Sequence, residues 1–301
     1  MPELPAVEYT RKMIEEKTLN MRVSSVKFTN DTNTPDELIF SEAAAEFVKG
    51  NFIGTRVEEV GRWGKQMWIL LRNEDLKNHN ALLMHLGMTG FVQFEGNGRL
   101  EYESSPSRGD PTDIWPPRFT KFIIEFCGDD GKMTKMVFCD ARRLGKIDVM
   151  SGLCENASFG IIDKFGLGFD PLFAMPPRGE FQKAFAELQI KRKINIKTLL
   201  MEQGFVAGLG NWMVDDILMM AGINPKRKLS TLIDTEVTRL HKSIKELTAI
   251  SVAVDADKNK FPKDWLFHIR WQHGKETLTG LEVKCEKVSG RTTFWVPSLQ
   301  K

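Results

Sequence analysis

The chain has 301 residues, of which 42% are hydrophobic and 27% charged, and its formal net charge is +2. This is an ordinary globular composition, and the length suffices for two domains with separate cores. No apolar run reaches the roughly 18 residues of a membrane-spanning helix, no charged segment followed by an apolar one resembles a secretory signal, and the four cysteines form no C-x-x-C pair that would indicate a disulfide framework or a cysteine zinc site.

Residues 1–160 predict a β-rich domain that begins with a helix. Pro5 suits a first helical position, and Val7, Met13 and Ile14 follow with helical spacing. A second helix is predicted near 41–50, with Ser41 as its N-cap and Gly50 at its end. Short β-branched or aromatic segments predict strands, and together they favour a β-sandwich: RVSSVKF (22–28), TRVEEV (55–60), KQMWILL (65–71), FVQF (91–94), KFIIEF (121–126), MVFCD (136–140) and KIDVM (146–150).

Residues 161–178 predict an interdomain linker, because this part of the chain is rich in Gly and Pro and lacks periodicity. Residues 179–301 are mainly helical in pattern, including a long helix through Val237 and Leu247, and a final hairpin turns near Ser289 and Gly290. One apolar helical face is predicted from the spacing of Phe181, Ala184, Phe185 and Leu188. The sequence therefore predicts an α+β protein with two domains.

The turn GFVAGLGNWM (204–213) lies between two predicted helices and is a candidate anion site. Asn211 stands where a helix N-cap is expected, and backbone N–H groups at a helix start bind anions. Two basic clusters flank the turn, KRKINIK (191–197), which contains Lys197, and PKRK (225–228). By itself the segment is more typical of an ordinary connection between two helices.

Several further residues are weak candidates when each is considered alone. Pro2 would become a free secondary amine if Met1 were removed, with a pKa of roughly 7.7–8.0 for such a group, although Pro2 and Glu3 also fit an unremarkable start of a chain. Met88 in HLGMTG (85–90) and Arg142 in ARRLG (141–145) stand in loops that could contact a duplex. Lys65 lies in a glycine-flanked turn and Arg291 lies beside the predicted hairpin turn, and solvated cations are common at both kinds of position.

Taken together and in this order, these segments resemble the formamidopyrimidine-DNA glycosylase / endonuclease VIII family. The resemblance rests on MPELP, GK before a strand, HLGMTG, RRLGK, IKTLLMEQGFVAGLGN and GRTTFWVP, and it extends over nearly the whole chain. VDADKNKFPKDWLFH (254–268) resembles the plant and fungal branch of that family.

The resemblance implies a β-sandwich with a leading helix, a domain with a helix–two-turn–helix motif, and a terminal finger. It implies that the amine of Pro2 attacks C1′ of a damaged nucleotide and forms a Schiff base, while Glu3 moves protons. Lys65 is implied as a further catalytic residue that holds phosphate. Six side chains are implied as DNA contacts: Lys197, Asn211 and Arg291, together with Met88, Arg142 and Leu144, which are implied as the wedge that fills the gap left by base flipping. The implied partner is damaged double-stranded DNA, with no cofactor, no metal and no membrane.

Four departures from the family pattern accompany the resemblance. Val296 and Leu299 stand where the second cysteine pair of a zinc finger would be, so we expect a zinc-free finger packed through Val283 and Phe294. Ala6 replaces a usual Glu, Leu144 replaces a usual wedge Phe, and Asp216 replaces a usual Glu.

Two functions remain open on these residues. The first is a bifunctional glycosylase and abasic-site lyase that removes formamidopyrimidines and hydantoins in preference to 8-oxoguanine, since the stretch before the final hairpin is shorter than in bacterial relatives. The second is a weakly active or inactive protein that binds damaged or abasic DNA. We expect a monomer in a reducing compartment, the nucleus or, for a bacterial source, the cytoplasm.

Overall fold

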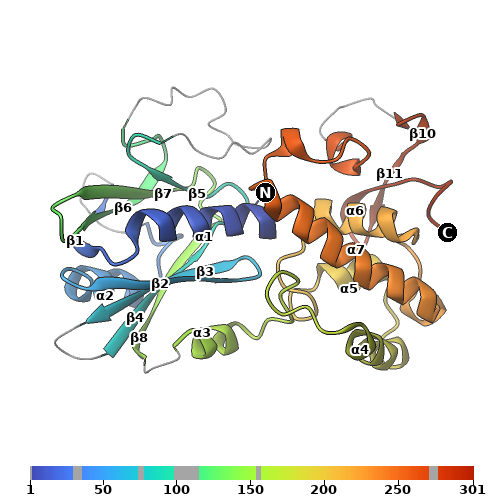
Figure 1. Cartoon of the computed structure of the whole chain (residues 1–301), viewed down its shortest axis with the longest axis horizontal. Helices are drawn as coiled ribbons and strands as arrows, with labels where there is room; N and C mark the ends of the chain where they lie inside the picture. Colours follow the sequence, from blue (N-terminus) through green and yellow to red (C-terminus); the bar gives the residue numbers. More distant parts are fainter. Residues whose placement is uncertain (1, 30–35, 74–77, 98–114, 154–156, 271–276) are drawn as a thin grey trace. The chain divides into compact units, whose positions relative to one another are not determined.

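The computed structural model describes residues 2–29, 36–73, 78–97, 115–153, 157–270 and 277–301. It divides into two compact units (Figure 1). The first contains Pro2 and Ala6–Phe165, and the second contains Glu3–Pro5 and Gly166–Lys301. The helix α1 (Leu4–Thr18) therefore starts in the second unit and continues in the first.

The first unit is an antiparallel β-sandwich, as the sequence predicts. Its strands follow the order β5-β7-β6-β1-β2-β3-β4-β8, and β1 joins β2 through the pair Arg22 and Arg56. One core of apolar side chains fills the interior of the sandwich, and α1 adds Val7 and Ile14 to this core. The strands are β1 (Arg22–Phe28), β2 (Arg56–Trp63), β3 (Gln66–Asn73), β4 (Asn78–His85), β5 (Phe91–Phe94), β6 (Thr120–Cys127), β7 (Met133–Cys139) and β8 (Lys146–Leu153).

Two short helices complete the first unit. Helix α2 (Glu42–Asn51) confirms the predicted helix, and the Ser41 hydroxyl accepts a hydrogen bond from the Ala44 N–H at 3.2 Å, as an N-cap does. Helix α3 (Ala157–Phe165) was not predicted, and it includes residues 161–165 of the segment expected to be linker. Its Ala157 and Ile161 are buried against the outer side chains Trp68, Leu70 and Leu83 of β3 and β4.

The second unit is helical, with small β-elements at its C-terminal end. Its helices are α4 (Arg178–Lys191), α5 (Ile196–Met201), α6 (Asn211–Ala221), α7 (Asp234–Ala253) and the 3₁₀ turns η1 (Leu229–Thr231), η2 (Lys258–Lys260) and η3 (Leu266–His268). The predicted face of α4 is partly wrong: Phe181 and Phe185 are buried, but Ala184 is exposed. Ala184 lies beside the buried stripe of the helix, which Phe181 and Phe185 form with the partly buried Leu188.

The predicted terminal hairpin is confirmed. Strands β11 (Lys284–Val288) and β12 (Arg291–Trp295) pair around Ser289 and Gly290, which both have positive φ, as a two-residue hairpin turn requires. The short strands β9 (Thr277–Leu278) and β10 (Leu281–Glu282) precede it. Val283 is buried and Phe294 is partly buried in one apolar cluster beside this hairpin, as expected from the sequence.

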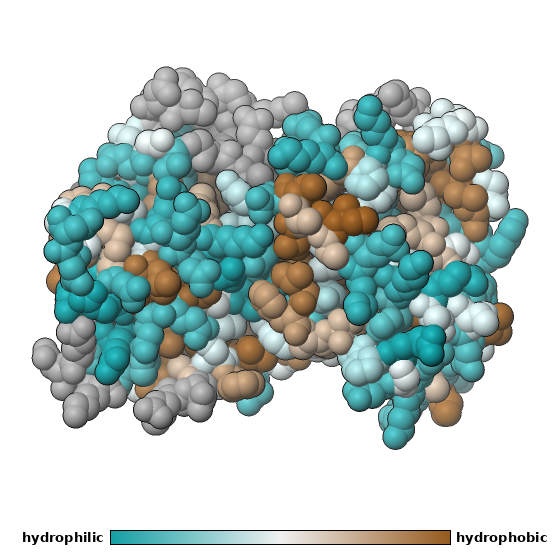
Figure 2. All heavy atoms as spheres, in the orientation of Figure 1, coloured by the Kyte–Doolittle hydropathy of each residue, from teal (hydrophilic) through white to brown (hydrophobic). Residues whose placement is uncertain are grey.

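The surface is mostly hydrophilic on the face shown in Figure 2. Among the described residues, no helix is both long and apolar enough to cross a membrane.

Gly61 provides a test of the sandwich, because a Cβ there would lie 2.1 Å from the Trp68 ring on the paired strand β3. We expect Gly61→Ala to lower the free energy of unfolding by about 1–3 kcal/mol through overpacking. Gly50→Ala is the matched control: nothing lies within 4 Å of its added Cβ, and alanine favours the helix by roughly 0.5–1 kcal/mol. Urea unfolding measures both variants. Equal changes in their free energies of unfolding would contradict the close packing of Gly61 against Trp68.

Candidate functional site

The N-terminal segment is fixed by helix α6. The Glu3 side-chain oxygens accept hydrogen bonds from the backbone N–H groups of Trp212 and Met213, each at 3.2 Å, and Glu3 is 2% exposed. The next residue, Leu4, donates its N–H to the Gly208 carbonyl at 3.1 Å. A carboxylate at a helix N-terminus satisfies otherwise unbonded donors and lies at the positive end of the helix dipole.

The glycines of the turn before α6 make room for this segment. A Cβ on Gly210 would lie 2.1 Å from the Glu3 carboxyl carbon, and one on Gly208, which has φ +99°, would lie 2.7 Å from the Leu4 side chain. The expectation for Asn211 was therefore wrong in detail. Gly210 is the N-cap, Asn211 is the first helical residue, and two of the N–H groups proposed to bind an anion are bonded to Glu3.

In the first unit, buried charges tie the turn that carries Lys65 to helix α1. The Arg62 guanidinium donates to the Glu8 carboxylate at 2.8 Å and to the Gly64 carbonyl at 2.9 Å, and both side chains of the pair are buried. Lys65 follows Gly64 between β2 and β3 and is half-buried, while Pro2 is buried ahead of the same helix. The pair thus fixes the base of the Lys65 turn to the helix that follows Pro2.

His85 belongs to the same neighbourhood, although the sequence did not single it out. Burial and the nearby Lys65 cation both lower the pKa of His85. The Gly87 N–H donates to Nδ1 at 3.1 Å, so the neutral ring carries its proton on Nε2. The only sequence signal was its position at the start of HLGMTG.

The three expected wedge residues stand on two adjoining loops. Met88 is 41% exposed and Leu144 is 43% exposed, and Arg142 is also exposed. The loops meet closely, since a Cβ on Gly87 would lie 2.5 Å from the Leu144 carbonyl carbon. The structure thus brings Met88 and Leu144 onto neighbouring segments of the first unit.

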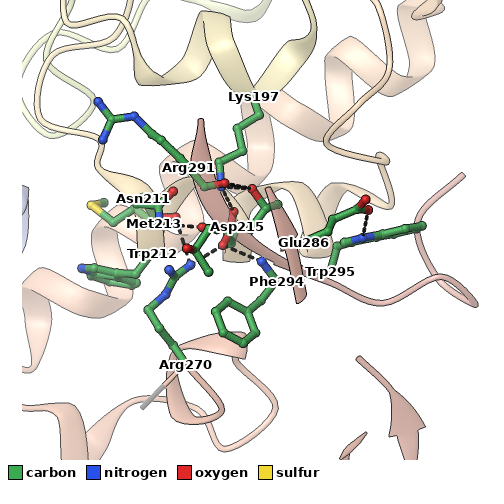
Figure 3. Close-up of polar contacts among 12 residues, drawn as sticks. Lys197, Asn211, Trp212, Met213, Asp215, Arg270, Glu286, Arg291, Phe294 and Trp295 are labelled. Atoms are coloured by element: carbon green, nitrogen blue, oxygen red, sulfur yellow. Dashed lines mark hydrogen bonds and ion pairs between the residues drawn. The ribbon is translucent and has the colours of Figure 1, made fainter. Parts of the chain in front are cut away.

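In the second unit, Lys197 is buried at the start of α5 (Figure 3). Its ammonium donates to Asp215 at 2.6 Å and to the Thr293 hydroxyl at 2.7 Å, and only 1% of the side chain is exposed. Asp215 also accepts from the Phe294 N–H at 2.9 Å and pairs with the Arg270 guanidinium. Burial lowers the pKa of Lys197 and raises that of Asp215, while their mutual attraction opposes both changes.

These contacts fix the terminal hairpin to α6. The Asn211 amide donates to the Thr292 carbonyl at 2.8 Å, whereas the exposed Arg291 side chain leads away from the buried ion pairs (Figure 3). The hairpin turn is held as well, because the Asn195 amide donates to the Ser289 hydroxyl at 2.9 Å. Asn211 and Arg291, both expected to hold phosphate, therefore lie on elements that are bonded to each other.

The Asp216 carboxylate is hydrogen-bonded to the protein's own backbone. It is fully buried and accepts from the Leu266 N–H at 2.5 Å and the Phe267 N–H at 3.1 Å, at the start of η3. Burial raises the pKa of Asp216 well above its ordinary value.

No three His, Cys, Asp or Glu side chains gather into a metal-binding group within the described parts of the chain. Cys285 of β11 is an exposed free thiol. Apolar packing, the Asp215 contacts and the hydrogen bonds from Asn195 and Asn211 hold the hairpin.

Comparison with known proteins identifies the family of the two units. Residues 1–147 match the formamidopyrimidine-DNA glycosylase N-terminal domain, and residues 167–263 match the formamidopyrimidine-DNA glycosylase H2TH domain. A formamidopyrimidine-DNA glycosylase of Arabidopsis thaliana is 33% identical over 302 residues, covering 100% of this chain and 71% of the relative. The chain belongs to the formamidopyrimidine-DNA glycosylase family.

Other proteins of this family also match the chain over nearly its whole length. The formamidopyrimidine-DNA glycosylase of Pelotomaculum thermopropionicum is 28% identical, with 100% of this chain and 99% of the relative covered. The fold is that of Lactococcus lactis Fpg in complex with abasic-site DNA, with a TM-score of 0.75 at 23% identity and 99% of each chain covered.

Asp215 is the residue on which the hairpin contacts converge, and its removal leaves two buried cations without their carboxylate. We expect Asp215→Ala to lower the free energy of unfolding by about 3–5 kcal/mol. Glu286→Ala is the matched control, since Glu286 of β11 bonds Lys226 and Trp295 at a site where its side chain is 35% exposed; there we expect a loss of roughly 0–1 kcal/mol. Both variants are measured by denaturant unfolding. Equal losses of unfolding free energy would contradict the role of the buried Asp215 ion pairs in holding the hairpin.

Proposed function

We propose that the protein is a bifunctional DNA glycosylase and abasic-site lyase of base excision repair, with the amine of Pro2 as its nucleophile once Met1 is removed. The observation that carries the proposal is the bonding of Glu3 to the start of α6, which holds the residue next to Pro2 in place. Membership of the formamidopyrimidine-DNA glycosylase family also supports the proposed activity.

The proposed chemistry uses the chain alone. The amine of Pro2 in its neutral form attacks C1′ of the damaged nucleotide, and the base leaves as Glu3 supplies and moves protons. The resulting iminium acidifies the C2′ proton. Loss of that proton expels the 3′ phosphate by β-elimination, and δ-elimination then expels the 5′ phosphate.

The proposed DNA contacts divide by chemistry. Lys65, Asn211 and Arg291 hold phosphates, Lys197 supports the same region from its buried position, and Met88, Arg142 and Leu144 occupy the gap left by the flipped nucleotide. These phosphate contacts make binding sensitive to salt. We propose that a monomer acts on damaged duplex DNA, in the nucleus for a eukaryotic source or in the cytoplasm for a bacterial one.

We further propose that the protein belongs to the zinc-free, plant and fungal branch. The Arabidopsis relative and the apolar packing of Val283, Phe294 and Val296 beside the hairpin support this.

A weakly active or inactive binder of damaged DNA is the second candidate. Ala6 favours it, because this side chain, 7% exposed, cannot contribute the carboxylate that the family usually has there. Asp216 favours it as well, since its carboxylate is bonded to η3.

The nucleophile is tested by borohydride trapping on a duplex with one abasic site. We expect the parent to give a covalent protein–DNA band, because borohydride reduces the imine to a stable bond. The band should disappear when a tag blocks the terminus, and weaken or disappear for Pro2→Gly. Tight binding to that duplex with no band from the parent would favour the second candidate, and Ala6→Glu is then the first variant to test for restored trapping.

The lesion preference is tested by base release from matched duplexes. We expect formamidopyrimidine and hydantoin release to exceed 8-oxoguanine release, since the stretch before the hairpin is short compared with bacterial relatives; its residues 271–276 lie outside the described part of the structure. Release of 8-oxoguanine as fast as formamidopyrimidine would refute the preference.

Arg291 is tested by the salt dependence of binding. We expect Arg291→Ala to weaken binding to all sequences alike and to reduce the slope of log affinity against log salt by about one unit, as loss of one phosphate contact does. Lys287→Ala, on the paired strand of the same hairpin, is the control for a general loss of positive charge. An unchanged slope for Arg291→Ala would mean that Arg291 does not touch phosphate.

A further inference from the structure

Asp140 is a buried carboxylate that neither the proposed chemistry nor the proposed phosphate contacts use. It follows the last residue of β7 and is 0% exposed. Oδ1 accepts from the Thr89 hydroxyl at 2.5 Å and the Arg142 N–H at 3.1 Å. Oδ2 accepts from the N–H groups of Leu144 at 2.8 Å and Gly145 at 2.7 Å.

The four donors come from two loops that are distant in sequence. Thr89 directly follows Met88, and the three backbone donors belong to the loop that carries Arg142 and Leu144. One side chain therefore holds both loops that expose the expected wedge residues.

The backbone around Asp140 is shaped to permit this arrangement. Gly87 has φ +61° and lies so close to Leu144 that a Cβ would be 2.5 Å from its carbonyl group. Arg143, which is not glycine, also has a positive φ of 53°. A conformation that L-residues disfavour is kept where the surrounding hydrogen bonds determine it.

A neutral side chain cannot reproduce these bonds. Burying a carboxylate is costly unless hydrogen bonds compensate for the lost water, and here both oxygens accept from two donors each. Asparagine has one accepting oxygen, so its NH₂ group would face either the Arg142 N–H or the pair of N–H groups from Leu144 and Gly145. The two accepting oxygens of the Asp140 side chain thus serve both loops at once.

We propose that Asp140 is a positioning residue that assembles the wedge before DNA binds, by holding the Met88 loop and the Arg142–Leu144 loop in one arrangement. The proposal rests on the proposed function. Extruding a nucleotide from a paired duplex needs the gap to be filled at once, whereas a nucleotide that is already single-stranded needs no such filling. Asp140 therefore matters for paired substrates and much less for single-stranded ones.

The test compares Asp140→Asn with the parent on two substrates, each in borohydride trapping. One is a duplex with an abasic site opposite a normal base, and the other is a single strand with the same abasic site. We expect trapping on the duplex to slow roughly 10- to 100-fold, as misplacement of a positioned group does, and trapping on the single strand to change little. A 2-aminopurine beside the lesion should lose its fluorescence rise on binding, because the stack is not opened.

Three further variants separate positioning from folding. The quantity compared is the ratio of the trapping rate on the duplex to that on the single strand. Thr89→Val removes one hydrogen bond to Asp140 with little change of shape, and it should lower this ratio less than Asp140→Asn does. Thr89→Ser keeps the hydroxyl, so its ratio should equal that of the parent. Asp170→Asn is the control for loss of a buried carboxylate, since Asp170 is also 0% exposed and accepts from the Leu172 and Phe173 N–H groups in the second unit; it should not change the ratio.

The outcomes are distinct. Equal slowing on both substrates, or no slowing on either, overturns the role of Asp140 while the proposed function stands. If Asp140→Asn does not fold, an unchanged ratio for Thr89→Val overturns it. A parent that traps neither substrate overturns the proposed function itself, together with this inference.

Discussion

The bonding of Glu3 to the first turn of α6 is the constraint on which the second unit depends. A carboxylate three residues from the start of the chain occupies the N–H groups of Trp212 and Met213, and this requires glycine at 208 and 210. The glycine-rich turn is therefore shaped by the chain's own N-terminal segment. Because the positive end of α6 and two N–H groups both favour the anion, the terminus is held without a disulfide or a metal ligand among the described residues.

The same physical device recurs at Asp140 and Asp215. Each is a carboxylate with almost no exposed surface, and each joins segments that are far apart in sequence. Asp140 accepts from the Thr89 hydroxyl and from nearby backbone N–H groups, and Asp215 accepts from Lys197 and from the Phe294 N–H. A buried carboxylate without such donors would be strongly unfavourable, so the folded arrangement is the one in which the donors converge. Loops held in this way keep their geometry although their outer side chains, such as Met88 and Arg291, reach solvent.

Local features were predictable from the sequence and long-range contacts were not. Strands 22–28 and 91–94, the N-cap Ser41 and the turn at Ser289 follow from alternation, capping and turn chemistry within a few residues. Helix α3 was missed because its short apolar pattern lies beside a Gly- and Pro-rich segment. The Glu3 contact with α6, the exposure of Ala184 and the burial of Lys197 depend on partners up to about 200 residues away, which no local pattern specifies.

Helix α6 links the two halves of the proposed reaction within one rigid element. Its first turn bonds Glu3 beside the nucleophile, and Asp215, four residues after Asn211 and so on the same face, bonds the hairpin that carries Arg291. Asp216, one residue on, holds η3. A rotation or shift of α6 would therefore move Glu3, Asn211 and the hairpin that carries Arg291 together.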